Sequence, residues 1–332
     1  MTLRLDGNDA VAIERAAALL AAGELVAFPT ETVYGLGARA DDPAAVLKIF
    51  RAKGRPETHP LIVHVAEPAL IAPFAAAVPA LAQRLIDAFW PGPLTLILPR
   101  VASIGAAAAG HQDTIGLRCP SHPVARALLA AAHARGVPGV AAPSANRFGR
   151  ISPTRASHVI DEFGARFGDT LAVLDGGDAE VGIESSIVDC ARGHPVLLRP
   201  GVLSRARLEA VAGEPLRAPD ASAPRAPGTL AAHYAPNAKL RLMPSAVLHT
   251  ALQVLRDPLP TLAVYSRGTP PGAARGVRHR RMPALPEQAA HELFSVLREL
   301  DAEGVQLIWV EEPPPQSEWD GVRDRLTRAA AA

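Results

Sequence analysis

Apolar and polar positions alternate in short blocks over residues 1–212. Segment 9–22 is rich in alanine and has the spacing of an amphipathic helix, and the apolar run ELVAF that follows it has the length of a buried strand. Further amphipathic segments predict helices at 43–52, 78–90, 122–135, 154–163 and 204–212. Short apolar runs predict strands at 61–65, 94–98, 114–118, 138–142, 171–174, 185–189 and 195–198. Because strands outnumber helices and several are consecutive, we expect an α/β domain with a twisted mixed sheet flanked by helices.

The remainder of the chain divides into two parts. Residues 213–237 are rich in proline, alanine and small polar residues, and a connection of that length is usually either disordered or a functional lid. After it, the runs LRLM, TLAVY and VQLIWV predict strands, and 245–256 and 286–302 predict helices. We therefore expect a domain over 1–212, a linker over 213–237 and a small Rossmann-like α/β domain with a parallel sheet over 238–332.

Composition and charge narrow the class of protein. Of the 332 residues, 48% are apolar and 20% are charged, as in a folded globular protein. The formal net charge of +1 gives no general attraction to nucleic acid or to membranes, so local clusters must hold any anionic ligand. Cys119 and Cys190 form neither a metal motif nor a disulfide framework, so we expect a cytoplasmic protein. We expect no signal peptide, since the N-terminus MTLRLDGNDA has acidic residues and no apolar h-region. We also expect no membrane span, since no apolar run reaches about 18 residues.

The segment FPTETVYGLG places polar side chains in a loop between an apolar run and a predicted helix. Thr30, Glu31, Thr32 and Tyr34 could all form hydrogen bonds there. A strand that ends in polar residues and glycines before a helix is how α/β proteins present a ligand site at the carboxyl edge of a sheet. An ordinary polar connection is equally compatible with this segment alone.

A cluster of cations follows in RAKGRPETHPLIVHV. The helix dipole favours cations at a helix C-terminus, which explains any one of Arg51, Lys53 and Arg55. Three cations in five positions, however, exceed what capping of a helix needs. Arg presents a planar fork and Lys a compact charge, so Lys53 and Arg55 suit a polyphosphate. His59 and His64 flank the next strand, where His64 is as compatible with a core histidine as with a ligand contact.

A second cluster lies in VAAPSANRFGRISPT. We expect Ser144 and Asn146 to point the same way from an extended segment, and Ser152 to cap a helix that Pro153 begins. Paired donors beside a helix N-terminus would form an anion site. Motifs of nucleotide-binding glycine loops, metalloproteases and serine hydrolases are absent from the sequence.

Two arginines follow strands, Arg118 in TIGLRCP and Arg199 in VLLRPG. A strand-terminal arginine is commonly just solvated, but both fall where the carboxyl edge of the sheet is expected. Between them, GIESSIVD carries Glu184, Ser185 and Ser186 into a strand.

Taken together, PTETVYGLG, Lys53 with Arg55, Ser144 with Asn146, ESSIVD, LRPG and the linker ending HYAP resemble the YrdC-like family, in its longer two-domain form of L-threonylcarbamoyladenylate synthase. The resemblance covers almost the whole chain and keeps the family's motif order. It implies synthesis of threonylcarbamoyl-AMP and pyrophosphate from L-threonine, bicarbonate and ATP, for the threonylcarbamoyladenosine modification of tRNA. It also implies Mg²⁺ bound with ATP without a dedicated protein metal site, a downstream tRNA threonylcarbamoyl transferase complex as partner, and no stable binding to nucleic acid or membrane.

The resemblance also implies roles for individual residues. The residues expected to contact L-threonine are Thr32, His64, Arg118 and Ser185. Those expected to hold ATP are Lys53, Arg55, His59, Thr114, Ser144, Asn146, Ser152, Arg199, His233 and Tyr234, of which Lys53 and Arg55 are expected to be catalytic. Such a set suits a reaction that needs positioning and charge stabilisation and no enzyme nucleophile.

In the family the linker folds back over the nucleotide as a lid, and here His233 and Tyr234 match it. The chain departs from the family's pattern at Ala226, Ala231 and Ala232, where a serine and a bulky or basic residue are usual, which leaves the anchoring of the lid open. Two alternatives to the synthase are an RNA-binding factor and a carbamoyl-adenylate former that takes carbamoyl phosphate, as in hydrogenase maturation proteins. The near-neutral charge and the lack of an aromatic platform disfavour the first, and the lack of acylphosphatase and zinc-finger segments disfavours the second.

Overall fold

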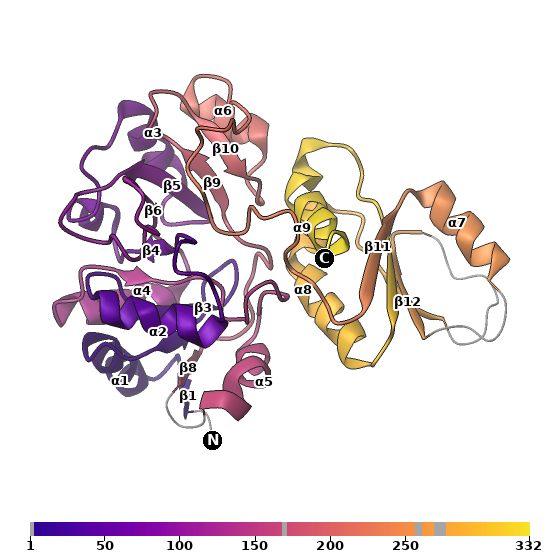
Figure 1. Ribbon diagram of the computed structural model, residues 1–332, viewed down its shortest axis with the longest axis horizontal. Coiled ribbons are helices and arrows are strands. Elements are labelled where there is room, and N and C mark those ends of the chain that lie inside the picture. The colour runs from indigo at the N-terminus through magenta and orange to yellow at the C-terminus, as the bar shows by residue number, and fades with distance from the viewer. Residues whose placement is uncertain (1–2, 168–170, 256–260, 269–276) are drawn as a thin grey trace.

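The chain folds into two lobes joined by a long linker (Figure 1). This computed structural model describes residues 3–167, 171–255, 261–268 and 277–332. The larger lobe holds the N-terminal part of the chain, and the smaller one holds the part after the linker. Within the described ranges, no helix is long and apolar enough to cross a bilayer.

A mixed sheet forms the core of the larger lobe. Its strands are β1 (Leu3–Asp6), β2 (Val26–Phe28), β3 (Gly35–Arg39), β4 (Ile62–His64), β5 (Leu94–Pro99), β6 (Thr114–Arg118), β7 (Val140–Ala141), β8 (Ala172–Asp175), β9 (Ser186–Asp189) and β10 (Val196–Arg199). They lie in the order β1-β8-β2-β3-β7-β4-β6-β5-β9-β10. Pairs such as β4 with β6 and β5 with β9 are parallel, whereas β2 with β3 and β5 with β6 are antiparallel. The predicted mixed sheet is confirmed.

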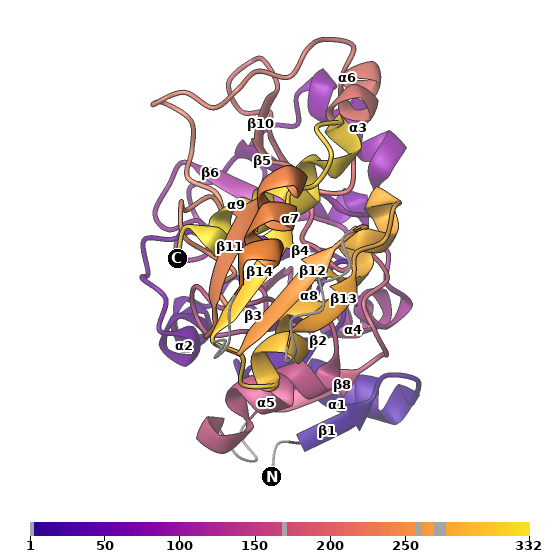
Figure 2. The same ribbon diagram turned by 90° about the vertical axis from the view of Figure 1, so that its right-hand side faces the viewer.

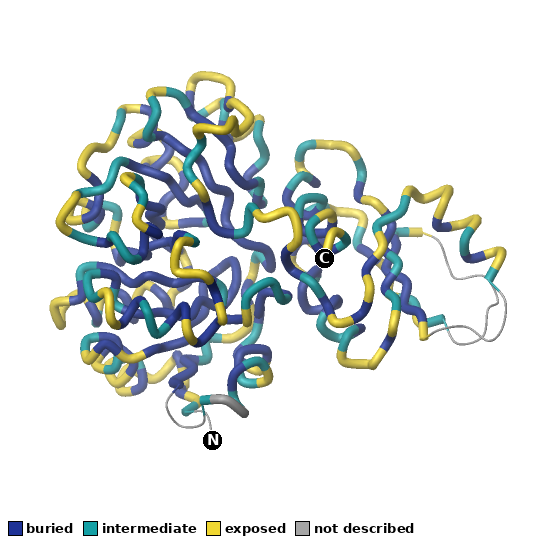
Figure 3. The backbone as a smooth tube through the Cα atoms, viewed as in Figure 1, coloured by how far each residue is buried: buried dark blue, intermediate teal, exposed yellow. Residues whose placement is uncertain are grey.

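Helices cover both faces of this sheet. They are α1 (Ala10–Ala21), α2 (Pro43–Lys53), α3 (Ala80–Phe89), α4 (Pro123–Ala134), α5 (Ala156–Phe167) and α6 (Arg205–Ala212), with a 3₁₀ turn η1 (Pro68–Ile71). Side chains of a strand alternate between faces, so Val26 and Phe28 pack with α1 and α4, while Ala27 packs with the cluster that contains α2, α3, α5 and α6. Burial is accordingly concentrated along the strands (Figure 3).

The polar loop after β2 leads to another strand, not to a helix as the sequence pattern predicts. β3 runs antiparallel to β2, with Phe28 opposite Gly35 and Val26 opposite Gly37. The two glycines misled the prediction because glycine is usually a breaker. At Gly37, however, a Cβ would lie 2.8 Å from both Phe28 Cε1 and Val140 Cγ1, so only glycine allows these strands to pack so closely.

The helix predicted at 154–163 begins later, at Ala156, and extends to Phe167. Ser152 lies four residues before this start and is not its N-cap, and its hydroxyl donates to the Glu184 carboxylate instead. The capping prediction is therefore wrong, and the segment 151–155 before the helix is irregular.

The smaller lobe has a parallel sheet, as predicted. Its strands are β11 (Lys239–Met243), β12 (Leu262–Ser266), β13 (Arg278–Arg281) and β14 (Leu307–Glu311), in the order β11-β14-β12-β13. Its helices are α7 (Ser245–Val254), α8 (Pro286–Ala302) and α9 (Asp320–Ala330), with a 3₁₀ turn η3 (Ser317–Trp319). β13 and α9 were not predicted, and the predicted end of the helix 245–256 lies outside the described residues.

Two helices of the smaller lobe face the larger one. α8 and α9 lie between the small sheet and the N-terminal lobe, whereas α7 lies on the outer face of that sheet (Figures 1 and 2). Thr154 and Ser295 share a hydrogen bond of 2.8 Å across this boundary, and Arg325 of α9 reaches Glu184 of the larger lobe. The linker 213–237 contains no helix or strand of its own.

Candidate active site

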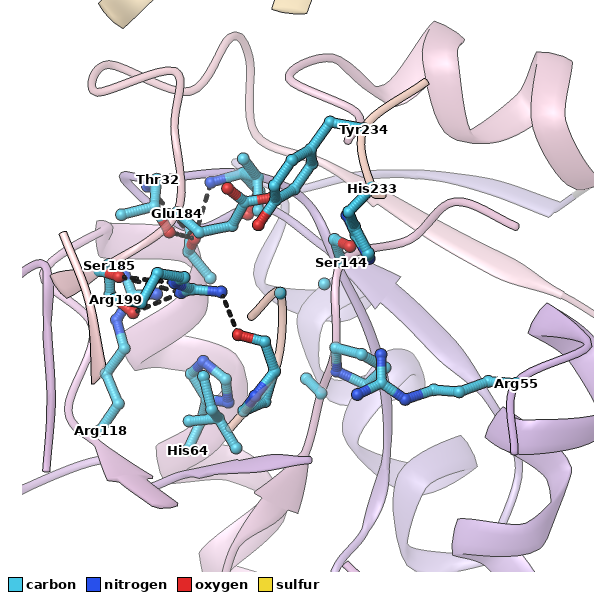
Figure 4. A pocket seen from close by; sticks show the side chains of 18 residues that line it. Thr32, Arg55, His64, Arg118, Ser144, Glu184, Ser185, Arg199, His233 and Tyr234 are labelled. Carbon is cyan, nitrogen blue, oxygen red and sulfur yellow. Dashed lines mark hydrogen bonds between the residues drawn. The ribbon is translucent and has the colours of Figure 1, made fainter. Parts of the chain in front are cut away.

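A small cavity lies where several strands of the large sheet end, beneath the last part of the linker. Its volume is about 50 Å³. Of the fourteen residues expected to bind a ligand, nine line it: Thr32, Arg55, His64, Arg118, Ser144, Ser185, Arg199, His233 and Tyr234. Figure 4 shows Arg118 and Arg199 on one side, Arg55 pointing in from the other, and His233 and Tyr234 above them. A space of this size holds about one or two waters, so the covering segment must move to admit a larger ligand.

One wall of the pocket contains a buried ion pair. Arg118 Nη2 lies 2.8 Å from Glu31 Oε1, and both side chains are only 4% exposed. His64 pairs with Arg118 across the parallel strands β4 and β6. Burial first, and then Arg118, lower the pKa of His64 to about 3, so this ring is neutral at physiological pH. The ring both lines the pocket and packs edge-on to Phe28, so His64 serves core and pocket together.

The loop that holds Thr32 is organised by its own side chains. Thr30 Oγ1 donates to the Val33 carbonyl at 2.6 Å and lies 2.8 Å from Thr32 Oγ1. These contacts fix the local turn, and both threonines line the pocket.

Arg199 connects the sheet to the linker. Its Nε and Nη2 donate to the Ser185 carbonyl at 3.2 and 2.9 Å, and its Nη1 donates to the Pro227 carbonyl at 2.9 Å. Ser185 Oγ in turn lies 2.8 Å from Thr95 Oγ1. Burial lowers the pKa of Arg199, yet a guanidinium stays charged at neutral pH. The cation is thereby fixed in orientation at the pocket wall.

Lys53 and Arg55 flank Gly54, which ends α2 in the left-handed conformation. Arg55 lines the pocket and donates through Nη2 to the Pro60 carbonyl at 2.8 Å. Lys53 does not line it, because its Nζ is bound to the carbonyls of Ser144, at 2.5 Å, and Asn146. Burial, and then Arg55, lower the pKa of Lys53 well below its ordinary value. In this closed conformation the lysine therefore holds the loop that carries Ser144.

The expected pairing of Ser144 and Asn146 does not occur. The Asn146 amide N–H donates to the Ser144 carbonyl at 3.0 Å, so the chain turns there and is not extended. Asn146 Nδ2 donates to the carbonyls of Arg147 and Arg150, both at 2.8 Å. Ser144 alone faces the pocket, and Asn146 fixes the following loop.

Three further predicted residues lie outside the lining, namely Ser152, whose hydroxyl donates to Glu184, His59 and Thr114. His59 packs edge-on to Phe148, whose ring also contacts His233 and Arg55. Thr114 begins β6, four residues before Arg118, which places it about 13 Å away along the strand. Their roles toward a ligand stay predictions.

His233 and Tyr234 close the pocket from above. The Tyr234 ring stacks on Phe294 of α8, with centroids 5.4 Å apart. Its backbone has φ of 63°, which is rare for a bulky side chain and is held by the packing around it. Burial lowers the pKa of His233 to about 3 and raises that of Tyr234 to about 12, so both are neutral at physiological pH.

The structure shows how the linker is anchored despite its alanines. Ala226 is buried in an apolar cluster with Ile62, Ile187 and Leu198, so it packs on the sheet. The Leu230 carbonyl, just before Ala231 and Ala232, accepts a hydrogen bond from Arg328 of α9. This basic side chain of the smaller lobe holds the linker at the place where the family usually has a bulky or basic residue. Residues 226–235 are thus held from both lobes.

Sequence reasoning missed the roles of two site residues. Glu184 lines the pocket and accepts hydrogen bonds from Ser152 and Arg325. Its place in ESSIVD was a signal, but nothing there indicated a distant partner. Arg325 interrupts the apolar stripe of Val322, Leu326 and Ala329 on α9, and a cation in such a stripe could have marked it as a buried contact.

Several buried polar atoms at this site lack a hydrogen-bond partner among the described residues. They are Glu31 Oε2, Arg55 Nε, His64 Nδ1, His233 Nδ1 and Tyr234 Oη. Buried polar groups are nearly always paired, so their concentration around one cavity indicates a ligand site. With three arginines at its wall, the site suits an anionic ligand.

Comparison with known proteins identifies the family of this chain. The sequence model of the Sua5/YciO/YrdC family, described as telomere recombination, matches residues 18–201, and a model described as the C-terminal domain of threonylcarbamoyl-AMP synthase matches residues 203–331. The chain belongs to the Sua5/YciO/YrdC family. A member from Bacillus subtilis, named threonylcarbamoyl-AMP synthase, is 38% identical, with 99% of this chain and 96% of the relative covered.

Two other comparisons extend over the linker and the smaller lobe. A threonylcarbamoyl-AMP synthase from Pyrococcus abyssi is 36% identical, with 96% of this chain and 94% of the relative covered. The crystal structure of P. abyssi Sua5 complexed with L-threonine superposes with a TM-score of 0.88 at 34% identity, over 99% of this chain and 97% of that chain. The chain is therefore a full-length match to the two-domain form of the Sua5/YciO/YrdC family.

Proposed function

We propose that this protein is an L-threonylcarbamoyladenylate synthase, which forms threonylcarbamoyl-AMP and pyrophosphate from L-threonine, bicarbonate and ATP. The observation that carries the proposal is a closed pocket in which Arg55, Arg118 and Arg199 converge beneath His233 and Tyr234. Full-length relatives with this activity in their names support it. These relatives favour the synthase over an RNA-binding factor.

The wall around Arg118 is our candidate for the threonine site. A guanidinium matches a carboxylate with two parallel hydrogen bonds, and Arg118 is preset by its ion pair with Glu31. Thr32 and Ser185 offer hydroxyls to the amino acid, and neutral His64 offers an unpaired Nδ1. The crystal structure of the P. abyssi relative contains L-threonine, which supports threonine as a ligand of this fold.

The side lined by Arg55, Ser144 and Arg199 is our candidate for the ATP phosphates. Lys53 and Asn146 position the loop that carries Ser144, and Ser152 orients Glu184. His59 and Thr114 remain weaker candidates, since neither lines the cavity in this conformation.

The chemistry needs positioning more than reactive side chains. The threonine amine and bicarbonate give a carbamate and water, and a carbamate oxygen then attacks the α-phosphorus of ATP while the bond to pyrophosphate breaks. Fixed arginines on both sides of the cavity offset the charge on the phosphates as it shifts to the leaving group. No bond to the protein forms in either step.

Mg²⁺ is proposed to enter with ATP as part of the substrate. The two carboxylates at the site, Glu31 and Glu184, are each paired with an arginine. The protein therefore offers hydroxyls and carbonyls. The phosphate oxygens would balance the charge of the metal, and water would complete its coordination, as Mg²⁺ prefers. Bound in this way, it would polarise the phosphates.

The linker gives the pocket its cover. A mixed anhydride between a carbamate and a phosphate hydrolyses readily, so exclusion of water preserves the product. Residues 227–234 cover the cavity here and must open for exchange. We further propose a cytoplasmic enzyme that hands its product to a tRNA threonylcarbamoyl transferase complex.

Pyrophosphate release tests the proposal. Purified protein with MgATP should release pyrophosphate only when L-threonine and bicarbonate are both present. Arg55→Met should abolish the release, whereas Arg135→Met, which removes a surface ion pair with Glu14, should not. Release that is indifferent to threonine would contradict the proposed reaction.

A further inference from the structure

Arg325 is a cation from the smaller lobe that ends at the wall of the pocket. Its side chain is fully buried, although α9 is otherwise amphipathic. Nε donates to Glu184 Oε2 at 2.7 Å, Nη2 to the Glu184 carbonyl at 3.1 Å, and Nη1 to the Pro200 carbonyl at 2.9 Å and to Asp324 at 2.8 Å. A buried guanidinium is costly unless its donors are satisfied, so these contacts fix its position closely.

The partners of Arg325 belong to the pocket. Glu184 lines the cavity, and its other oxygen accepts from Ser152. The guanidinium carbon of Arg325 also lies 5.3 Å from the centre of the Tyr234 ring, which covers the cavity. One side chain of α9 therefore contacts both the wall and the lid.

Glu184 presents an electrostatic problem for the proposed substrates. A buried carboxylate beside an ATP site would repel the phosphates unless a cation offsets it. Burial raises the pKa of Glu184, but Arg325, Arg199 and the hydrogen bond from Ser152 together outweigh burial and bring this pKa down to about 2, so the group is charged at neutral pH. Arg199 also serves Ser185 and Pro227, whereas Arg325 is directly bound to the carboxylate.

We propose that Arg325 is a positioning residue that neutralises Glu184 and seats Tyr234, so that the smaller lobe completes the ATP site electrostatically. This rests on the proposed function. It gives the smaller lobe a role in nucleotide affinity that goes beyond holding the linker in place.

Arg298 provides a matched control. It also crosses between the lobes, from α8 to Glu162 and to the carbonyls of Ile151 and Ser152, and it is largely buried. Neither Arg298 nor Glu162 lines the cavity. Arg298 contacts Ser152 only at its backbone carbonyl, so loss of Arg298 weakens the contact between the lobes while Glu184 keeps both Arg325 and the Ser152 hydroxyl.

Calorimetric titration with MgATP, in the full-length protein, tests the proposal without relying on turnover. Arg325→Met keeps the apolar stem and removes the charge, and it should raise the Kd for MgATP at least tenfold, or about 1.4 kcal/mol. Arg298→Met should leave the Kd within about twofold. Arg325→Lys keeps the charge, so its Kd for MgATP should lie between those of wild type and Arg325→Met. If Arg325→Met folds poorly, the lysine variant still measures the effect of losing the hydrogen bonds of the guanidinium.

A charge rescue separates electrostatics from structure. Adding Glu184→Gln to Arg325→Met removes the uncompensated carboxylate, so the Kd for MgATP should recover most of the loss. In turnover, Arg325→Met should raise KM for ATP more than it lowers kcat. Equal Kd values for the single and double variants, or equal losses in Arg325→Met and Arg298→Met, would overturn the proposal.

The two proposals fail in different ways. If wild-type protein binds MgATP but forms no pyrophosphate with threonine and bicarbonate, the proposed reaction is wrong and the titrations still decide the role of Arg325. If wild-type protein does not bind MgATP, both are wrong.

Discussion

Gly228 lies where the linker passes between two pocket residues, and its replacement tests the closed lid. It has φ of +71°, and a Cβ at this position would lie 2.3 Å from Tyr234 Oη and 2.8 Å from Arg199 Nη1. Neither neighbour can move freely, because Tyr234 is stacked on Phe294 and Arg199 is bound to the Ser185 carbonyl. We predict that Gly228→Ala disfavours the closed lid.

The magnitude follows from two costs. A left-handed conformation costs a residue other than glycine about 1–2 kcal/mol, and overpacking of a filled site costs about 1–3 kcal/mol. Their sum of about 2–5 kcal/mol acts on the closed conformation. At its lower end this reduces the closed population relative to the open one by about 30-fold, since about 1.4 kcal/mol corresponds to a factor of ten.

Steady-state pyrophosphate release would measure the effect, with Gly193→Ala as the matched control. Gly193 also has positive φ, of +77°, but a Cβ there meets nothing within 4 Å. Both variants share the backbone cost, and only Gly228→Ala adds the clash at the pocket. We expect kcat/KM for ATP to fall at least 30-fold in Gly228→Ala and to stay near wild type in Gly193→Ala. Equal activity in the two variants would refute the closed lid.

Three further predictions concern charge and burial. Glu31→Gln should lower the free energy of unfolding by about 3 kcal/mol, because it leaves the charge of Arg118 unpaired. L-Threonine should raise the Tm of this variant more than that of wild type, because the carboxylate of threonine replaces the lost partner of Arg118. Burial, and then Arg298, lower the pKa of His158 to about 4 in the folded chain, against about 6.5 unfolded. Between these pH values the unfolded chain binds a proton that the folded chain does not, so the free energy of unfolding should fall as pH drops from 6.5 to 4. Urea unfolding should show a smaller dependence of this free energy on pH in His158→Gln, by up to about 1.4 kcal/mol per pH unit. Lys53→Met should lower ATP turnover at least tenfold in the same pyrophosphate assay, and Lys53→Arg should not rescue it, because the larger head does not fit between two backbone carbonyls.

The sequence predicted the elements with strong periodicity and most of the pocket. The strand 114–118 and the helix 286–302 match β6 and α8 residue for residue. Arg118 and Arg199 were predicted to meet at one edge of the sheet, and both line the cavity. The positions of Arg118 and Arg199 could be predicted because each ends a strand, and the carboxyl ends of parallel strands form the ligand-binding edge of an α/β sheet.

The errors arose where tertiary contacts override local signals. Gly35 and Gly37 indicated a loop, but the close approach of neighbouring strands requires glycine within β3. Ser152 followed the pattern of a helix cap, yet a buried carboxylate 32 residues away binds its hydroxyl. Arg325 has a partner 141 residues away, and no pattern local to α9 encodes that partner.

The most direct test of the central claim follows the carbon of bicarbonate. Wild-type protein would be incubated with ¹³C-bicarbonate, L-threonine and MgATP, and the nucleotide products separated and weighed by mass spectrometry. We expect threonylcarbamoyl-AMP with one ¹³C, in a one-to-one ratio with pyrophosphate, and none from Arg55→Met. AMP and pyrophosphate without labelled product, at time points shorter than the product's lifetime, would contradict this claim.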